Sequence, residues 1–264
     1  MTIRQQPRTR RIMTTMEQTA SPPQKKRHRP SVRAGLWVIK RIERMLERQS
    51  LVGTTPFLDN RDFPWTGDLE ARWPVVREEL DGVMQDPERL PSFQEISKDQ
   101  TNLTQDDRWK TFFLYGYGYK MPGNCARCPE TTRLVESVPG METAFFSILA
   151  PGKHIPRHRG PYKGVVRCHL ALMVPEPRER CRIQVGDEEA HWEEGRCLVF
   201  DDTYKHAVQN DTEGTRVVLF LDVRRPLAFP ASALNRLVLA LIRRSPFIRD
   251  ARRNQRAWER RWGD

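Results

Sequence analysis

The 264-residue sequence lacks any run of 18 apolar residues, so we expect no segment to cross a bilayer as a simple helix. Its first residues lack the apolar stretch of a secretory signal. It has five cysteines, too few and too scattered for a disulfide scaffold, and the C-x-x-C pair Cys125 and Cys128 has no second pair, which argues against zinc there. The length suits one substantial core, and these absences together predict a protein of a reducing cytoplasm.

Acidic residues are scarce at both ends of the chain. Residues 1–33 contain nine Lys and Arg against one Glu, and residues 223–264 contain eleven Arg against three acidic residues. Since the formal net charge is +11, the middle of the chain carries a net charge of −5. The basic charge therefore does not lie on the central domain, and nucleic acid is not an expected partner.

The two ends also carry amphipathic patterns. Residues 1–34 are polar, basic and proline-containing, and we expect them to be disordered. Residues 36–48 then space their apolar side chains as a basic amphipathic helix, and residues 234–248 form a second, more apolar helix with arginines near its end. Two interpretations stay open: both helices pack on the core, or both lie in an anionic membrane surface. The second would make the protein peripheral on the inner face of the membrane.

The hydrophobic period changes once along the chain. Residues 65–95 have a helical pattern, whereas short runs rich in Val, Phe and Leu follow from about residue 110. These runs are separated by clusters of Pro, Gly, Asp and Asn, which is typical of a sandwich or a double-sheet jelly roll. The fold predicted is therefore mainly β.

Two histidines in the β region suggest a metal site. His158 and His206 each lie beside a predicted strand, where we expect turns, and Arg216 begins the strand ten residues after His206. An arginine that points inward needs an anionic partner, which a dicarboxylic acid would supply. Imidazole suits iron, so the set fits iron(II) with 2-oxoglutarate. Structural histidines are commoner than ligands, however, and spacing does not exclude that interpretation.

Four pieces of the sequence follow one another between about Trp109 and Pro226: "RWKTFFLYG", "FSILAPGKHIPRHRGPYKGVVRCHLAL", "CRIQVGDEEAHWEEGRCLVFDDTYKHAV" and "TRVVLFLDVRRP". In their sequence and order they resemble the aspartyl/asparaginyl β-hydroxylase family, which includes lipid A and ornithine-lipid hydroxylases. The resemblance implies a double-stranded β-helix (a cupin-like jelly roll) with N-terminal supporting helices. It divides the chain into residues 1–34, a helical part at 35–108, a catalytic core at 109–228 and a basic helical extension at 229–264.

The resemblance also implies site residues. His158 and His206 match the family's iron-binding histidines, and Arg216 matches the arginine that binds the distal carboxylate of 2-oxoglutarate, with Ser147 beside it. His169 and Arg167 match the pair that holds the metal-side carboxylate region of 2-oxoglutarate, although Arg167 could instead face substrate. A last match, Trp109, is an aromatic wall of the pocket.

Gly160 stands where many iron(II) oxygenases place a carboxylate ligand. The protein-acting members of the family have Gly at this position and a two-histidine site with water in the vacancy, whereas lipid A hydroxylases have Asp. The acidic pair Asp201 and Asp202 should hold the turn before His206 or contact its ring. His154 is expected to orient the metal loop, with a functional role as the alternative, and His191 to face solvent.

These features predict an Fe(II)/2-oxoglutarate-dependent hydroxylase that uses O₂. Gly160 resembles the protein-acting branch, but the basic apolar helices and the arginine-rich extension resemble the lipid enzymes. We therefore expect a lipid-linked acyl chain at a membrane surface as substrate, with aspartyl or asparaginyl residues of a peptide as the alternative. A halogenase and a non-catalytic jelly-roll binding module are less favoured alternatives.

Overall fold

The computed structural model describes residues 30–97 and 101–262. The chain divides into two compact units, Met1–Val38 and Ile39–Asp264, and the second contains both sheets. Most of the segment predicted to be disordered, residues 1–34, lies outside the described residues. Its last five residues differ from the prediction, because helix α1 (Pro30–Arg48) already begins at Pro30, a residue that suits the first turn of a helix.

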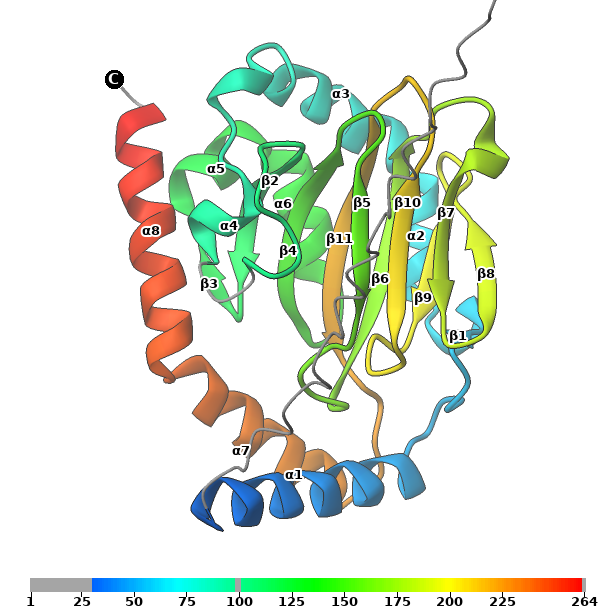
Figure 1. Cartoon of the computed structure of the whole chain (residues 1–264), viewed down its shortest axis with the longest axis vertical. Helices are drawn as coiled ribbons and strands as arrows, with labels where there is room; N and C mark the ends of the chain where they lie inside the picture. Colours follow the sequence, from blue (N-terminus) through cyan, green and yellow to red (C-terminus); the bar gives the residue numbers. More distant parts are fainter. Residues whose placement is uncertain (1–29, 98–100, 263–264) are drawn as a thin grey trace, which may run out of the picture. The chain divides into compact units, whose positions relative to one another are not determined.

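Two antiparallel sheets form the second unit (Figure 1). The larger sheet has the strand order β1-β9-β6-β11-β4-β2-β3, and the smaller has the order β5-β10-β7-β8. The bounds of the larger sheet's strands are Phe57–Leu58 (β1), Trp109–Gly116 (β2), Tyr119–Lys120 (β3), Met141–Leu149 (β4), Val165–Met173 (β6), Cys197–Phe200 (β9) and Arg216–Arg224 (β11). Those of the smaller are His154–His158 (β5), Cys181–Val185 (β7), Glu188–His191 (β8) and His206–Asn210 (β10).

The larger sheet is buried on both faces. One face shares a hydrophobic cluster with the smaller sheet, in which Val218 of β11 and Ala171 of β6 pack with Ile183 of β7 and Val208 of β10. The opposite face packs against helices α2 (Trp65–Ala71), α3 (Trp73–Val83) and α6 (Pro129–Ser137). Side chains two residues apart on each strand therefore enter the same core. This arrangement confirms the predicted jelly roll with supporting helices.

The helical pattern predicted for residues 65–95 is divided in the structure. Besides α2 and α3, it holds the short 3₁₀ turn Pro87–Arg89 and most of α4 (Phe93–Ile96), and another 3₁₀ turn, Asn60–Asp62, precedes it. Pro74 allows α3 to start but not α2 to continue, because proline lacks the N–H that a helix interior needs. Helix α5 (Pro122–Arg127) joins β3 to α6.

The C-terminal extension forms two helices instead of the single one predicted over residues 234–248. Helix α7 (Ala231–Arg243) ends before Pro246, which begins α8 (Pro246–Trp262). Asn254 of α8 donates its Nδ2 to the carbonyl of Ile96 in α4, 3.1 Å away. Within the described ranges no helix is both long and apolar enough to cross a membrane. The division of the chain into residues 1–34, 35–108, 109–228 and 229–264 stays a prediction.

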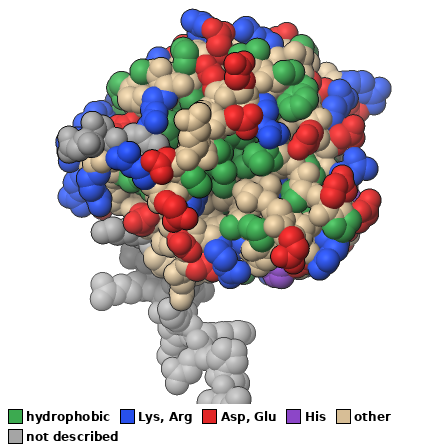
Figure 2. All heavy atoms as spheres, turned by 90° about the horizontal axis from the view of Figure 1, so that it is seen from above, with side chains coloured by type: hydrophobic (Ala, Val, Ile, Leu, Met, Phe, Trp, Pro, Cys, Tyr) green, Lys and Arg blue, Asp and Glu red, His purple; other side chains and the backbone are tan. Residues whose placement is uncertain are grey.

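Charges of both signs intermingle on the surface (Figure 2). On the face shown there, Lys and Arg lie beside Asp and Glu around a centre where hydrophobic side chains are exposed. Several large apolar side chains are also exposed on or near the C-terminal helices, among them Phe229, Leu237 and Leu241.

Candidate active site

His158 and His206 lie side by side on adjacent strands of the smaller sheet. His158 is the last residue of β5 and His206 the first of β10, and they are direct register partners. Their ring centroids are 4.1 Å apart. The prediction that both lie on turns is wrong, because each histidine is itself the terminal residue of a strand. Strand pairing thus brings together residues 48 positions apart in the sequence.

The backbone fixes the protonation of both imidazoles. His158 Nδ1 lies 2.9 Å from the carbonyl oxygen of Pro156, and His206 Nδ1 lies 3.0 Å from that of Tyr204. A carbonyl can only accept, so each Nδ1 carries the proton and each Nε2 keeps its lone pair. Burial lowers the pKa of His206 to about 3 and lowers that of His158 as well, and the cation of Arg167 adds to both shifts. Both rings are therefore neutral, as metal coordination requires.

Arg216 is buried without a carboxylate partner anywhere in the described residues. Its side chain is 1% exposed, and its guanidinium donates to the carbonyl and hydroxyl oxygens of Ser147 at 3.3 and 3.5 Å. Its Nε has no hydrogen-bond partner, and the guanidinium carbon lies 4.7 Å from the ring centroid of Trp192. Burial lowers the pKa of Arg216 to about 10. An uncompensated buried cation of this kind calls for an anion.

Ser147 and Trp109 complete the surroundings of that arginine. Trp109 Nε1 donates to the hydroxyl of Ser147 over 3.1 Å, so the hydroxyl lies between the indole and the guanidinium. Trp109 itself stacks on Phe93, with ring centroids 4.1 Å apart. These contacts hold Trp109 and Ser147 in place on the inner face of the larger sheet. On that face Arg216 and Trp109 are both register partners of Leu149 of β4.

His169 is a second buried polar side chain without partners. It is 5% exposed, neither ring nitrogen has a hydrogen-bond partner, and burial lowers its pKa well below the usual value. Its ring lies between Phe200 and Phe220, with centroids 5.0 and 5.2 Å away. A buried imidazole left unpaired costs about 1–3 kcal/mol. The same inner face thus contains two groups, His169 and Arg216, that a polar ligand would satisfy.

Arg167, in contrast, is fully paired within the protein. Its guanidinium contacts the carboxylates of Asp222 and Asp202, each at 2.9 Å, and stacks on Phe220 at 4.2 Å. Although burial lowers the pKa of Arg167, the two carboxylates hold it above its ordinary value. Burial raises the pKa of Asp202 to about 6, against the opposing effect of Arg167. Arg167 lies in the same neighbourhood as the histidines but already has its anions.

The two carboxylates of the acidic turn before His206, Asp201 and Asp202, have different partners. Asp201 accepts from the backbone N–H of Thr203 at 3.0 Å and from the guanidinium of Arg225 at 2.5 Å, which holds the turn as predicted. Asp202 turns toward Arg167, and its carbonyl accepts from the N–H of Gly160 over 2.7 Å. The alternative contact from these carboxylates to the ring of His206 is not formed, since Tyr204 supplies the acceptor.

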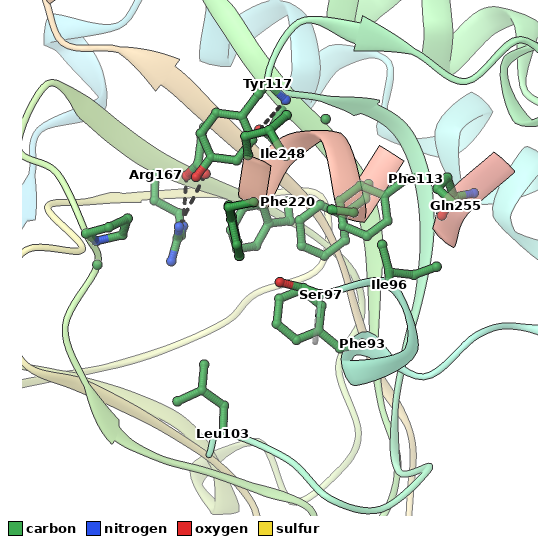
Figure 3. A pocket seen from close by; sticks show the side chains of 18 of the residues that line it. Phe93, Ile96, Ser97, Leu103, Phe113, Tyr117, Arg167, Phe220, Ile248 and Gln255 are labelled. Atoms are coloured by element: carbon green, nitrogen blue, oxygen red, sulfur yellow. Dashed lines mark hydrogen bonds and ion pairs between the residues drawn. The ribbon is translucent and has the colours of Figure 1, made fainter. Parts of the chain in front are cut away.

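A cavity of about 410 Å³ opens beside this cluster (Figure 3). At one end it is lined by His158, Gly160, Arg167, Asp202 and Asp222. Its remaining lining is mostly apolar and includes Phe93, Ile96, Leu103, Trp109, Phe113, Met121, Phe145, Phe220, Phe247, Ile248 and Ala251. The other predicted site residues, His206, Ser147, His169 and Arg216, lie outside the lining. The predicted set therefore divides into a cavity wall and a buried polar cluster.

Two further histidines lie away from this cluster. His154 is exposed at the start of β5, and its Nε2 pairs with Asp211 at 2.5 Å. His191 is exposed at the end of β8, 3.6 Å from Glu189, so the expectation that it faces solvent is confirmed. Neither ring joins the pair formed by His158 and His206.

The sequence interpretation missed Asp222 and Trp192. Asp222 could have been predicted, because it lies six residues after Arg216 in one strand. The alternation of side chains along a strand places both on the same face. Trp192 follows the end of β8, and its position over Arg216 depends on tertiary packing for which the sequence holds no local signal. Across residues 30–97 and 101–262, no cluster of three or more His, Cys, Asp or Glu side chains is placed to hold a metal ion.

Fold and site together define a jelly-roll protein with paired neutral histidines beside a buried, unpaired polar cluster. The family model for aspartyl/asparaginyl β-hydroxylase matches residues 70–226. The chain therefore belongs to the aspartyl/asparaginyl β-hydroxylase family of hydroxylases, which confirms the resemblance seen in the sequence.

Individual relatives agree with this assignment. The chain is 45% identical over 211 residues to an ornithine lipid ester-linked acyl 2-hydroxylase from Rhizobium tropici, with 80% of this chain and 75% of that protein covered. It is 32% identical over 169 residues to human aspartyl/asparaginyl β-hydroxylase, which covers 61% of this chain but only 21% of the human protein. A Pseudomonas putida prolyl-4-hydroxylase structure is 18% identical with a TM-score of 0.39, covering 58% of this chain and 87% of its own, a likeness too slight to carry an argument.

Proposed function

We propose that the protein is an iron(II)/2-oxoglutarate-dependent hydroxylase that acts on a lipid-linked acyl chain at a membrane surface. The observation that carries the proposal is the cavity, which begins at His158 and Arg167 and continues between apolar side chains. Such a lining suits a hydrocarbon chain, because it buries apolar surface and offers few hydrogen-bond partners. The similarity to a lipid acyl 2-hydroxylase supports the same substrate class.

His158 and His206 would hold the iron through their unprotonated Nε2 atoms. The backbone carbonyls of Pro156 and Tyr204 keep the Nδ1 protons in place and thereby fix the orientation of each ring, as partners of ligand histidines commonly do. Iron with 2-oxoglutarate and O₂ supplies the oxidising chemistry when bound. The protein's own part is to position the substrate and exclude water.

The buried polar cluster supports 2-oxoglutarate as the cosubstrate. Arg216 would bind the distal carboxylate together with Ser147, which would give the guanidinium the anion that it lacks. His169 would hydrogen-bond the metal-side region through a nitrogen that is now unpaired. Arg167 contributes less to this proposal than predicted, because Asp202 and Asp222 already neutralise it. Trp109 would wall both the cosubstrate and the cavity.

Hydroxylation of an aspartyl or asparaginyl side chain is the second candidate. Gly160, the similarity to the human enzyme and the position of Arg167 at the cavity favour it. A substrate carboxylate, however, would have to compete with Asp202 and Asp222 for Arg167. Halogenation and a purely binding role are less favoured, because no observation in the described residues specifically supports either one.

The outer face of α7 supports membrane association. Leu237 and Leu241, one turn apart, are 57% and 60% exposed, and Phe229 just before the helix is 82% exposed. Arg236 and Arg244 are exposed on the same helix or at its end. Apolar side chains flanked by arginines suit the boundary between acyl chains and anionic headgroups. An active enzyme at this boundary would meet lipid substrates directly.

Mass spectrometry tests the substrate class. Lipids extracted from cells with and without the gene should differ by species that gain one oxygen atom. Purified protein with iron(II), 2-oxoglutarate and O₂ should then produce the same species from the unmodified lipid extract, with one succinate formed for each oxygen added. Oxygen gain only on Asp or Asn of added peptides would replace the lipid proposal by the second candidate, and succinate-free turnover would overturn the cosubstrate.

A further inference from the structure

Helix α8 supplies one wall of the cavity although it lies beyond the residues matched by the family model, which end at 226. Its contribution consists of Phe247, Ile248, Ala251, Arg252 and Gln255. The wall opposite belongs to the larger sheet. The shape and polarity of this part of the cavity therefore depend on a segment outside the catalytic core.

A row of aromatic side chains leads from Arg167 and His169 toward this wall. Phe220, Phe145 and Phe113 lie in register on neighbouring strands β11, β4 and β2. Their rings are in contact, with centroids 4.2 and 4.4 Å apart, and the guanidinium of Arg167 lies 4.2 Å from the first of them. His169 is the register partner of Phe220 on β6, so the row from β6 to β2 spans three strand spacings, about 14 Å. An extended apolar segment could lie along this floor.

Gln255 lies at the far side of the floor. It is 1% exposed and lines the cavity, and Figure 3 shows it beyond Phe113, on the side opposite Arg167. Neither its amide oxygen nor its amide nitrogen has a hydrogen-bond partner among the described residues. Leaving a buried amide unpaired costs about 1–3 kcal/mol. Because both amide atoms are themselves buried, the side chain must turn toward the cavity for a group there that donates and accepts hydrogen bonds to recover that energy.

We propose that Gln255 is a specificity-determining residue that recognises a hydroxyl or amide group on the substrate, separated by an apolar segment from the end that reaches His158. The inference rests on the proposed function, since it assumes that the cavity takes the acyl part of the substrate. A plain hydrocarbon would leave the amide unpaired, whereas a chain with a polar group at the matching distance would satisfy it. The preferred substrate is therefore a chain that carries such a second polar group.

Binding measurements on the full chain without iron or 2-oxoglutarate test the inference. Saturated fatty acids and their ω-hydroxy derivatives, in a series of chain lengths, would displace a fluorescent apolar dye from the cavity. We expect wild type to prefer the ω-hydroxy acid about tenfold at one chain length, and Gln255→Met to lose that preference while it keeps its affinity for the plain acid. Arg256→Met, which changes the next, exposed residue of the helix, should behave as wild type.

A second readout separates recognition from a structural role. Because Gln255→Met removes an unpaired buried amide, it should not lower the melting temperature of the ligand-free protein. An equal affinity of wild type for both acids at every length, or the same preference in Gln255→Met, would overturn the inference even if lipid hydroxylation is found. Conversely, a Gln255-dependent preference without hydroxylation of any lipid would refute the proposed reaction and leave the recognition in place.

Discussion

The backbone of Gly160 lies directly against the carboxylate of Asp202. The N–H of Gly160 donates to the carbonyl of Asp202 at 2.7 Å, and a Cβ added at Gly160 would overlap the Asp202 carboxyl group. If His158 and His206 hold iron as proposed, position 160 is where many iron(II) oxygenases attach their carboxylate ligand. The protein thus has no room for that ligand, because a different carboxylate, itself paired with Arg167, fills the space.

Gly160→Asp should therefore fail to create a working three-ligand site. The new side chain must displace Asp202, and forced overpacking of this kind costs about 1–3 kcal/mol. We expect a lower melting temperature and loss of succinate formation. The double variant Gly160→Asp with Asp202→Gly, which moves the carboxylate from one position to the other, should recover most of the stability. A single variant as stable as wild type would contradict this packing relationship.

Much of the larger sheet could be predicted from its sequence. The runs that became β2, β4, β6 and β11 are strongly apolar and β-branched or aromatic, because both of their faces are buried. Strands β5 and β10 were not predicted. Their sequences, "HIPRH" and "HAVQN", have little intrinsic strand preference, and they become strands through pairing with each other and with β7.

The candidate site was predictable to a different extent in each of its parts. The histidines and Arg216 have residue types and spacing that suggest their chemistry, and strand alternation links Arg216 to Asp222. Neither Trp192 nor Gln255 carries such a signal. Trp is commonly buried and Gln commonly exposed, but neither residue type indicates which partner it meets when α8 or the end of β8 packs over the sheet. Long-range packing of this kind leaves no local pattern.

Arg216 and Arg225 form a matched pair for testing the cosubstrate site. Both are buried, but Arg225 is ion-paired with Asp201 at 2.5 Å, whereas Arg216 has no carboxylate partner in the described part of the chain. Arg225→Met should lower the free energy of unfolding by up to about 3 kcal/mol, because the buried carboxylate of Asp201 then keeps only Lys163, 3.3 Å away, as a charged partner. Arg216→Met should leave the ligand-free protein as stable as wild type or more stable.

The same Arg216 variant should lose its response to 2-oxoglutarate. A charge-assisted hydrogen bond contributes about 1.5–3 kcal/mol, so the affinity should fall at least tenfold. The shift of melting temperature with added 2-oxoglutarate measures this directly. A shift in Arg216→Met equal to that of wild type would exclude Arg216 as the anchor of the distal carboxylate.

The iron-free protein should become less stable as the pH is lowered through the range in which the buried His206 stays neutral. Burial lowers the pKa of His206 from 6.5 to about 3. Between these pH values the unfolded chain binds a proton at this position and the native protein does not. Stability is then greatest above about pH 6.5 and is lost progressively toward pH 3, by at most about 1.4 kcal/mol per pH unit from this group.

Urea unfolding of wild type and His206→Gln between these pH values checks the prediction. The variant should show a shallower pH dependence, because it has no proton to take up at that position. His154→Gln is the control, since His154 is exposed and paired with Asp211. Identical slopes for wild type and His206→Gln would show that His206 is not the group responsible.

Membrane association should depend on the exposed leucines of α7. The double variant Leu237→Ser with Leu241→Ser should reduce flotation with vesicles containing phosphatidylglycerol and leave the melting temperature unchanged, because both side chains face outward. Wild type should detach as salt rises, since screening weakens the contribution of the arginines. Leu239→Ser, at a buried position of the same helix, should instead destabilise the fold. Wild-type binding to neutral vesicles that is equal to binding to anionic ones would contradict the arginine contribution.

Metal binding should require both members of the histidine pair. Each ring offers one Nε2 lone pair, and no third protein ligand lies within reach among the described residues, so losing either ring leaves a single donor. His158→Ala and His206→Ala should each abolish iron(II) binding in anaerobic titrations, together with succinate formation. His154→Ala should retain both, because its ring is paired with Asp211 away from the cavity. If His158→Ala still bound iron with wild-type affinity, the metal would have to lie elsewhere, and His154 would be the first position to examine.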